Sequence, residues 1–232
     1  MNSKQKFQLS EAKPTPLRGV KASTLKLLLN TAMEMIADGK IPSIPEVASR
    51  SAVSRATAYR YFPTRAALIT AVIEASLGPV RTLSSSEPEG RERVLDLFQK
   101  TFPRFNEFEP QLRAAAQLSL EQGALERAGL LDEAPYRRGH RIRILEHALE
   151  PMKDRISNQT KERLHHALSI LYGIEPYIVL KDIWGLSNSE VEATTMWMVE
   201  SLIASALLGE KTSVDCNEST GTVRRKTKLI KA

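Results

Sequence analysis

Apolar residues recur at every third or fourth position over most of the chain between residues 23 and 210, which is the period of an α-helix. Alternating runs of β-branched residues, which would indicate strands, are few. A first amphipathic helix is predicted from Ser23 to Asp38. Gly39 is expected to end it, because glycine adopts a left-handed conformation without a Cβ penalty. The pattern therefore predicts an all-α protein.

Two short helices joined by a tight turn are predicted next. Ser43 and Glu46 have the spacing of a capping box, in which each side chain bonds the backbone N–H of the other residue. After a turn at residues 51–53, Ser54 is expected to cap a further short helix that ends near Tyr61. Two short helices with such a turn form a helix-turn-helix pattern.

The remaining pattern predicts a fourth helix, a helical body and a polar tail. Thr64 is expected to cap a helix that ends near Leu77, and a stretch rich in Gly, Pro and Ser follows. One body helix is predicted over 159–181, and a last one from a capping box at Ser187 to about Leu208. The chain thus divides into a flexible basic arm (1–22), a helix-turn-helix head (23–77), a helical body (78–210) and a disordered basic tail (211–232).

Composition narrows the class of protein. The 232 residues are 42% hydrophobic, which is enough to bury a core. A single cysteine, Cys216, excludes a disulfide framework and a zinc site with several cysteines. The early apolar run at residues 25–29 is too short to cross a bilayer, and no signal peptide is recognisable. We therefore expect a cytoplasmic protein without a membrane partner.

The net charge of +6 is unevenly distributed. Residues 1–81 carry a net +7, residues 82–210 a net −5 and residues 211–232 a net +4. A basic N-terminal module on an acidic body indicates that this module meets a polyanion such as DNA. From charge alone, an ordinary solvated surface remains an equal alternative.

The start of the third helix lacks acidic residues. Its first turn offers the hydroxyls of Ser54 and Thr57 and the guanidinium of Arg55, and no carboxylate occurs over residues 54–71. Acidic side chains usually occupy a first helical turn, because the N-terminal end of a helix attracts negative charge. Their absence leaves this end open to a phosphate.

Aromatic and basic side chains follow along the same helix. Tyr59 and Tyr61 carry phenol donors of the kind that position a phosphate backbone, and Arg55 and Arg60 have the fork that binds guanine in the major groove. Alternatively, the tyrosines pack with Phe62 in a small aromatic core and the arginines are merely solvated.

These residues carry a resemblance to a known family. The run Val53 to Leu68, with its Val-Ser-x-x-Thr-x-Tyr-x-Tyr-Phe pattern, resembles the tetracycline-repressor (TetR) family of bacterial transcription regulators. Ala52 departs from the glycine that the family usually has in the turn, and Arg65 replaces its commoner lysine. The resemblance, with the chemistry above, indicates DNA contacts from Ser43, Ser54, Arg55, Ala56, Thr57, Tyr59, Arg60, Tyr61 and Arg65.

The same resemblance implies a body that binds an effector and dimerises. Its two last helices are similar to the family's dimer-forming pair, although they could also close a monomeric core. Mixed aromatic residues with few polar groups suggest a largely apolar small molecule. The residues expected to contact this effector are Phe102, Gln117, Tyr172 and Glu175, from a wider set with Phe98, Phe105, Leu118, Glu121 and Trp184.

Catalytic and metal-binding patterns are weak. Glu162 and His165 form a single Glu-x-x-His pair, whereas a di-iron bundle needs two such pairs and two further glutamates. His140 and His147 lack a completing ligand, and Cys216 has no nearby histidine. We expect no cofactor, no metal and no enzyme activity.

The resulting hypothesis is a homodimeric repressor that binds a palindromic DNA operator and is released by a small-molecule effector. Two alternatives stay open: a helical-bundle enzyme or ligand carrier, and a DNA-binding protein that responds to no ligand.

Overall fold

The computed structural model describes residues 19–78, 80 and 85–226 and, beyond Leu208, only the course of the backbone. These residues hold α-helices and no strand, which confirms the all-α class. The elements are α1 (Val20–Ala37), α2 (Ile44–Arg50), α3 (Arg55–Tyr61), α4 (Arg65–Leu77), α5 (Gly90–Glu107), α6 (Glu109–Arg127), α7 (His140–Leu149), the 3₁₀ turn η2 (Glu150–Met152), α8 (Asn158–Leu171), α9 (Glu175–Asp182) and α10 (Asn188–Lys226).

The short helices of the head begin at the predicted caps. Ser43 Oγ accepts from the backbone N–H of Glu46 at 3.4 Å, and the Glu46 carboxylate accepts from the Ser43 N–H at 2.7 Å, so the capping box is complete. Ser54 caps α3, and Thr64 caps α4. The helix α1 begins at Val20, three residues before the predicted start, and residues 1–18 of the predicted arm lie outside the described residues.

The turn between α2 and α3 contains a strained alanine. Ala52 has a φ of 54°, a left-handed conformation that glycine adopts freely and alanine does not. The conformation costs about 1 kcal/mol, which neighbouring contacts offset. One such contact is the hydrogen bond that the buried Ser51 hydroxyl donates to the carbonyl of Val47 at 2.7 Å.

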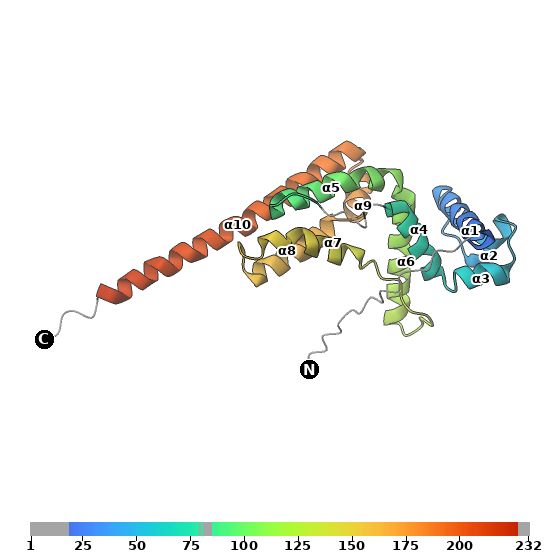
Figure 1. The fold of residues 1–232 in the computed structure, drawn as a ribbon, viewed down its shortest axis with the longest axis horizontal. Coiled ribbons are helices and arrows are strands. Elements are labelled where there is room, and N and C mark those ends of the chain that lie inside the picture. The colour runs from blue at the N-terminus through green and yellow to red at the C-terminus, as the bar shows by residue number, and fades with distance from the viewer. Residues whose placement is uncertain (1–18, 79, 81–84, 227–232) are drawn as a thin grey trace.

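The core of the head extends into the body. Residues of α1–α4 form one apolar cluster, which Ala114, Ala115 and Leu118 of α6 complete. Ile73 of α4 packs against this cluster and against the core of the body. The helices α4 and α6 thus lie between the head and the rest of the body (Figure 1). A displacement of α4 therefore reaches both cores.

An aromatic group lies at the centre of the body core. On α5, Phe98 meets Phe102 and Tyr172 edge to face. Phe105 meets Tyr172 and Tyr177 in the same way, and the ring centres of these four pairs are 5.2 to 6.2 Å apart. Helices α7 and α10 pack against α5, and α8 packs against α7 and α10. Such buried aromatic pairs contribute packing energy beyond the area that they remove from water.

The helix predicted over 159–181 is wrong, because the structure interrupts it. The helix α8 ends at Leu171, and α9 begins at Glu175. Pro176 has no backbone N–H to donate, and its ring would clash with the carbonyl four residues earlier in a continuous helix. A Cβ at Gly173 would overlap the carboxylate of Glu175 and the guanidinium of Arg141, so a larger residue in the break would have to displace this ion pair.

The last helix is longer than predicted. We expected it to end near Leu208 and the tail from residue 211 to be disordered, but α10 continues to Lys226 and projects away from the body (Figure 1). The expectation is therefore wrong for residues 211–226, and residues 227–232 lie outside the described residues. No proline follows Pro176, and extending an existing helix avoids the cost of nucleating a new one.

Candidate nucleic-acid interface and cavity

One face of α3 is exposed and carries two arginines and a tyrosine. Arg55, Ala56, Tyr59 and Arg60 are exposed, whereas Ala58 on the opposite face is 1% exposed and packs into the head. The side chain of Tyr59 is 45% exposed, so Tyr59 does not belong to an aromatic core. Two guanidinium forks and one phenol therefore point outward together, and these groups suit contacts with bases and phosphates.

At the beginning of α3, local side chains supply the hydrogen-bond partners. Ser54 Oγ accepts from the backbone N–H of Thr57 at 3.2 Å and donates to the Thr57 hydroxyl at 2.9 Å. No acidic residue lies in the first turn, as the sequence predicts. Ser54 thus uses its hydroxyl proton on Thr57, whereas the Thr57 hydroxyl only accepts and can still donate to an anion. The exposed guanidiniums of Arg55 and Arg60 are the stronger candidates for binding an anion, because they are charged.

Tyr61 connects α3 to the start of α1. Its hydroxyl donates to the backbone carbonyl of Lys21 at 3.1 Å, and its ring packs against the core of the head. The Arg60 guanidinium lies 5.9 Å from the centre of the Tyr61 ring. To donate to a phosphate, Tyr61 would have to release Lys21, and its predicted DNA contact stays a prediction.

Ser43 and Arg65 also make internal contacts. The Ser43 hydroxyl donates to the Glu46 carboxylate at 2.6 Å, and the hydrogen bonds from the side chain and backbone of Ser43 lower the pKa of Glu46. Arg65 donates to both carboxylate oxygens of Glu121 at 3.3 Å and to the carbonyl of Ile41 at 3.5 Å. Arg65 therefore joins the head to α6, and its positive charge already has an acidic partner.

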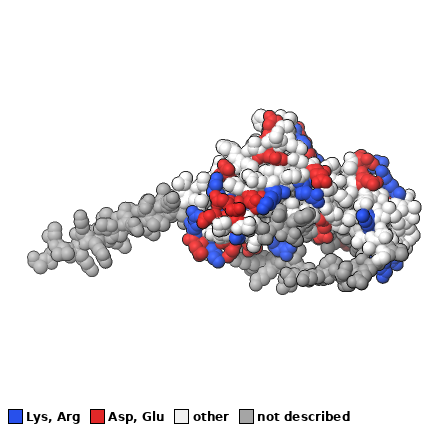
Figure 2. Space-filling view, turned by 45° about the horizontal axis from the view of Figure 1, so that its top comes forward, with Lys and Arg blue, Asp and Glu red and all other residues white. Residues whose placement is uncertain are grey.

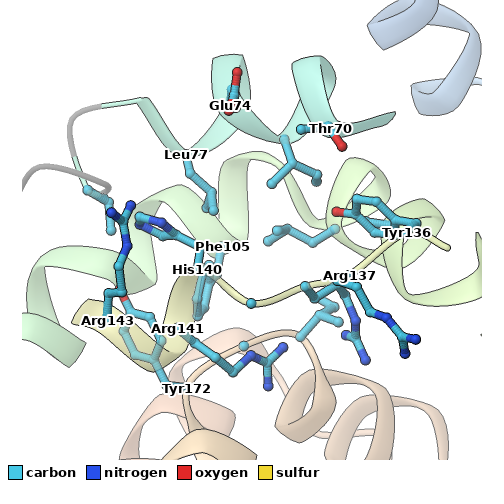
Figure 3. Close-up of a pocket in the computed structure, with 18 of the residues that line it drawn as sticks. Thr70, Glu74, Leu77, Phe105, Tyr136, Arg137, His140, Arg141, Arg143 and Tyr172 are labelled. Atoms are coloured by element: carbon cyan, nitrogen blue, oxygen red, sulfur yellow. The ribbon is translucent and has the colours of Figure 1, made fainter. Parts of the chain in front are cut away.

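A cavity of about 420 Å³ lies in the body beside α4 (Figure 3). It is bounded by α4, α5, α6, the segment 135–139, the start of α7 and the junction between α8 and α9. Its volume falls within the range of roughly 300–1,000 Å³ that is typical of small-molecule sites. Among its lining residues, Ile73, Leu77, Leu112 and Ile174 provide apolar walls.

The predicted effector residues are only partly at this cavity. Tyr172 lines it, as does Phe105 from the wider set. Phe102 does not, because its ring is buried edge to face against Phe98 in the body core. Gln117 does not line the cavity either, because it is exposed on the surface of α6. Phe102 and Gln117 therefore lie outside this cavity, and their predicted effector contacts stay predictions. Glu175 does not line the cavity but forms ion pairs with Arg138 and Arg141, which do.

Sequence reasoning missed four arginines at this site. Arg137, Arg138, Arg141 and Arg143 all line the cavity, and Figure 3 shows Arg137 and Arg141 on the side opposite α4. Arg138 Nη1 and Arg141 Nη2 lie 2.8 and 3.0 Å from the same oxygen of Glu175. The available signal was four arginines within seven residues, which we interpreted only as part of a charged body.

The segment before α7 is anchored by a buried glutamine. Gln122 of α6 is 4% exposed, and its carbonyl oxygen accepts from the backbone N–H of Tyr136 at 2.6 Å. Its amide donates to Glu133 at 2.5 Å. These bonds hold the segment against α6 and help to position the arginines that follow it.

Tyr172 contributes a neutral hydroxyl next to the cavity. Burial raises the pKa of Tyr172 to about 12, although a hydrogen bond with Thr101 and the charge of Arg141 favour the ionised form. The two hydroxyls of Tyr172 and Thr101 are 2.9 Å apart. Tyr172 is therefore protonated at neutral pH and available to shape a ligand site without adding charge.

Within the part of the chain that the structure describes, no group of three or more His, Cys, Asp or Glu side chains could hold a metal ion. His165 Nε2 lies 3.0 Å from the carbonyl oxygen of Ile142, so its nearest polar partner is backbone. The charged residues on the face seen in Figure 2 are interleaved in sign over the body. This pattern is typical of a solvated surface.

Comparisons with known proteins extend the resemblance. Residues 28–72, from α1 to α4, match the model of the tetR family of bacterial regulatory proteins. A TetR transcriptional regulator from Rhodococcus sp. RHA1 is similar over 80% of this chain and 97% of that chain, with a TM-score of 0.51 and 15% identity. A tetR-family regulator from Streptomyces coelicolor is similar over 90% and 89%, with a TM-score of 0.56 and 18% identity. A comparison with curated proteins gives no match.

Proposed function

Because this chain belongs to the TetR family of bacterial regulatory proteins and is a DNA-binding transcriptional regulator, we propose that it is a repressor. It binds a near-palindromic operator as a homodimer and leaves the operator when a small molecule binds the body. The observation that carries the proposal is the exposed face of α3, where Arg55, Tyr59 and Arg60 lie within the residues that match the family model.

Exposed apolar side chains on the last helices support a dimer. Ile170 of α8, Trp197 and Leu208 of α10 are 66%, 68% and 61% exposed in the single chain. The stretch Asn188–Leu208 is long and apolar enough to cross a membrane by length and composition alone, yet only 22% of its apolar window is buried. In a DNA-binding regulator, a second copy of the chain is the natural cover for such a face.

The position of the cavity supports regulation through α4. Thr70, Ile73 and Leu77 of α4 line it, and the same helix begins at Arg65 beside the recognition helix. A ligand that binds better when α4 is displaced changes the relative placement of the two heads in a dimer. The spacing of the two α3 helices then no longer fits successive major grooves.

Selection of bound DNA from a random pool, using the full-length protein, tests the proposal. We expect enrichment of a sequence with two inverted half-sites about one helical turn apart or slightly more. Enrichment of no sequence, together with a steep salt dependence on every DNA, would instead indicate a non-specific chromosome-binding protein. Adding small molecules to the selected complex then tests release.

A further inference from the structure

The cavity beside α4 has two chemically different sides. Ile73 and Leu77 of α4 and Leu112 of α6 provide apolar surface, whereas the segment leading into α7 brings guanidiniums (Figure 3). Buried apolar surface favours an apolar ligand body, and guanidinium groups favour a carboxylate or a similar anion. The two sides together differ from the largely apolar site that the sequence suggests.

Among the residues that the structure describes at the cavity, positive charges outnumber negative ones by one. Four arginines line it, and the only acidic lining residue among those that the structure describes is Glu74. Arg138 and Arg141 share Glu175, and Arg137 pairs with Glu126 at 2.7 Å. Arg143 has no acidic partner among the described residues. With His140 counted as neutral, three carboxylates face four guanidiniums, so a single negative charge on a ligand restores balance.

Arg138 also retains unused donor capacity. Its Nη1 lies 2.8 Å from Glu175 but is buried and forms no aligned hydrogen bond with any described residue. A buried donor without a hydrogen bond is costly, and a ligand oxygen at the cavity edge can satisfy it. The side chains of Arg138 and Arg141 are only 26% and 18% exposed, so water and salt screen their charges incompletely.

We propose that this cavity binds an amphipathic organic monoanion, with its apolar body between α4 and α6 and its anionic group at Arg138, Arg141 and Arg143. This assignment rests on the proposed function for the ligand's regulatory role. A neutral apolar ligand leaves the surplus charge and the Arg138 donor unsatisfied. A polyanion such as a nucleotide exceeds the surplus of one charge and does not use the apolar walls.

A matched pair of fluorescent probes tests the charge requirement on the full-length protein. The anion is 8-anilinonaphthalene-1-sulfonate, and its neutral counterpart is N-phenyl-1-naphthylamine, which has the same aromatic body without the sulfonate. We expect Arg138→Gln to weaken binding of the anionic probe about tenfold, which is the loss of one charge-assisted hydrogen bond. The neutral probe should change by less than about twofold.

Two further variants separate the site from the general surface. Arg143→Gln removes an exposed cavity charge that has no ion pair to break, so the fold is retained, and it should weaken only the anionic probe. Arg163→Gln is the matched control, because Arg163 is exposed on α8 and does not line the cavity. Displacement of the neutral probe by decanoate but not by decanol would extend the requirement to a carboxylate.

The outcome is decisive either way. Equal effects of Arg138→Gln and Arg143→Gln on both probes, or no effect on either, would overturn the proposal. In a separate experiment, the full-length protein is titrated with the selected operator in the presence of anionic or neutral compounds. If the protein binds the operator and only neutral compounds release it, the anion assignment alone is overturned. Retained anion selectivity without specific DNA binding overturns the proposed function alone.

Discussion

Arg65, the first residue of α4, donates to both carboxylate oxygens of Glu121 on α6, although the two residues are 56 positions apart in the chain. The pair connects the helix that follows the recognition helix to the body. The family resemblance assigns Arg65 to the phosphate backbone, so the same guanidinium has an internal partner and an expected external one. If Arg65 binds the phosphate backbone as proposed, Glu121 competes with DNA for its guanidinium.

Changing Glu121 to Gln should release Arg65 without removing the contact between α4 and α6. We expect operator affinity to rise about threefold at low salt, because one acidic group is lost near the DNA-facing head. The side chains of the pair are 31% and 46% exposed, so the free energy of unfolding should fall by less than about 1 kcal/mol. Titration of operator DNA and urea unfolding measure the two effects.

Glu162→Gln is the matched control for this change, because Glu162 is exposed on α8 and remote from the head in sequence and fold. It removes the same charge and should leave operator affinity unchanged. Equal gains in both variants would mean that net charge, and not release of Arg65, controls the affinity.

Changing Arg60 to Ala should relax discrimination between operator variants. Arg60 is exposed on the outward face of α3, and a bidentate contact with guanine contributes about 1–3 kcal/mol to choice of base. The Arg60→Ala protein should bind the selected operator more weakly by that free energy. Its affinity for an operator in which the contacted base pair is replaced should stay close to that of the natural protein. Tyr59→Phe is the comparison, because loss of a phosphate contact should weaken all sequences similarly. The same uniform loss in both variants would contradict the base-reading role of Arg60.

Changing Ala52 to Gly should stabilise the head. The φ of 54° at this position costs alanine about 1 kcal/mol, and glycine removes most of that cost while adding flexibility to the unfolded chain. We expect a net gain of roughly 0.5 kcal/mol in urea unfolding. Ala124→Gly on the exposed surface of α6 should instead lose about 1 kcal/mol, since its backbone is helical. A loss at Ala52 would show that its Cβ makes a stabilising contact.

The head could be predicted in detail because its signals are local. Ser43, Ser54 and Thr64 each bond a backbone N–H three residues away, so the caps can be read from short stretches of sequence. The sequence leaves the exposure of Tyr59 open, because a tyrosine in a short helix also suits an aromatic core, and the structure resolves it at 45% exposed.

The site in the body could not be predicted in the same way. Arg141 meets Glu175 across 34 positions, and the contact depends on how α7 packs against the break between α8 and α9. Periodicity specifies which face of a helix is apolar but not which helix covers it. The break itself had a signal in Gly173 and Pro176, but a continuous apolar pattern outweighed it in our interpretation.

Changing Trp197 to Glu should prevent dimerisation. Trp197 is 68% exposed on α10, and a carboxylate buried at a subunit interface would lack a partner. We expect the variant to sediment as a monomer and its operator affinity to fall at least about tenfold, because one half-site alone is contacted. Leu130→Glu is the control: Leu130 is 71% exposed just after α6 and should tolerate the charge. A dimeric Trp197→Glu protein would place the interface elsewhere.

Changing Tyr172 to Phe should alter how stability depends on high pH. Burial raises the pKa of Tyr172 to about 12 in the folded protein, against about 10 in the unfolded chain. The folded state therefore holds its proton more tightly. Below pH 10 the tyrosine is protonated in both states and the free energy of unfolding keeps its full value. Between about pH 10 and pH 12 only the unfolded chain ionises, so the free energy of unfolding falls by a total of about 3 kcal/mol. Urea unfolding across this range measures it.

The Phe variant should be about 1 kcal/mol less stable at pH 8, where the hydrogen bond with Thr101 is missing. The Thr101 hydroxyl still donates to the carbonyl of Leu97, so no buried donor is stranded. The difference between the two proteins should then shrink and reverse as the pH rises, since only the natural chain has to ionise Tyr172. Tyr177, whose pKa burial also raises, stays in both proteins and serves as a common background. Parallel pH profiles for the two proteins would show that Tyr172 titrates as it does in water.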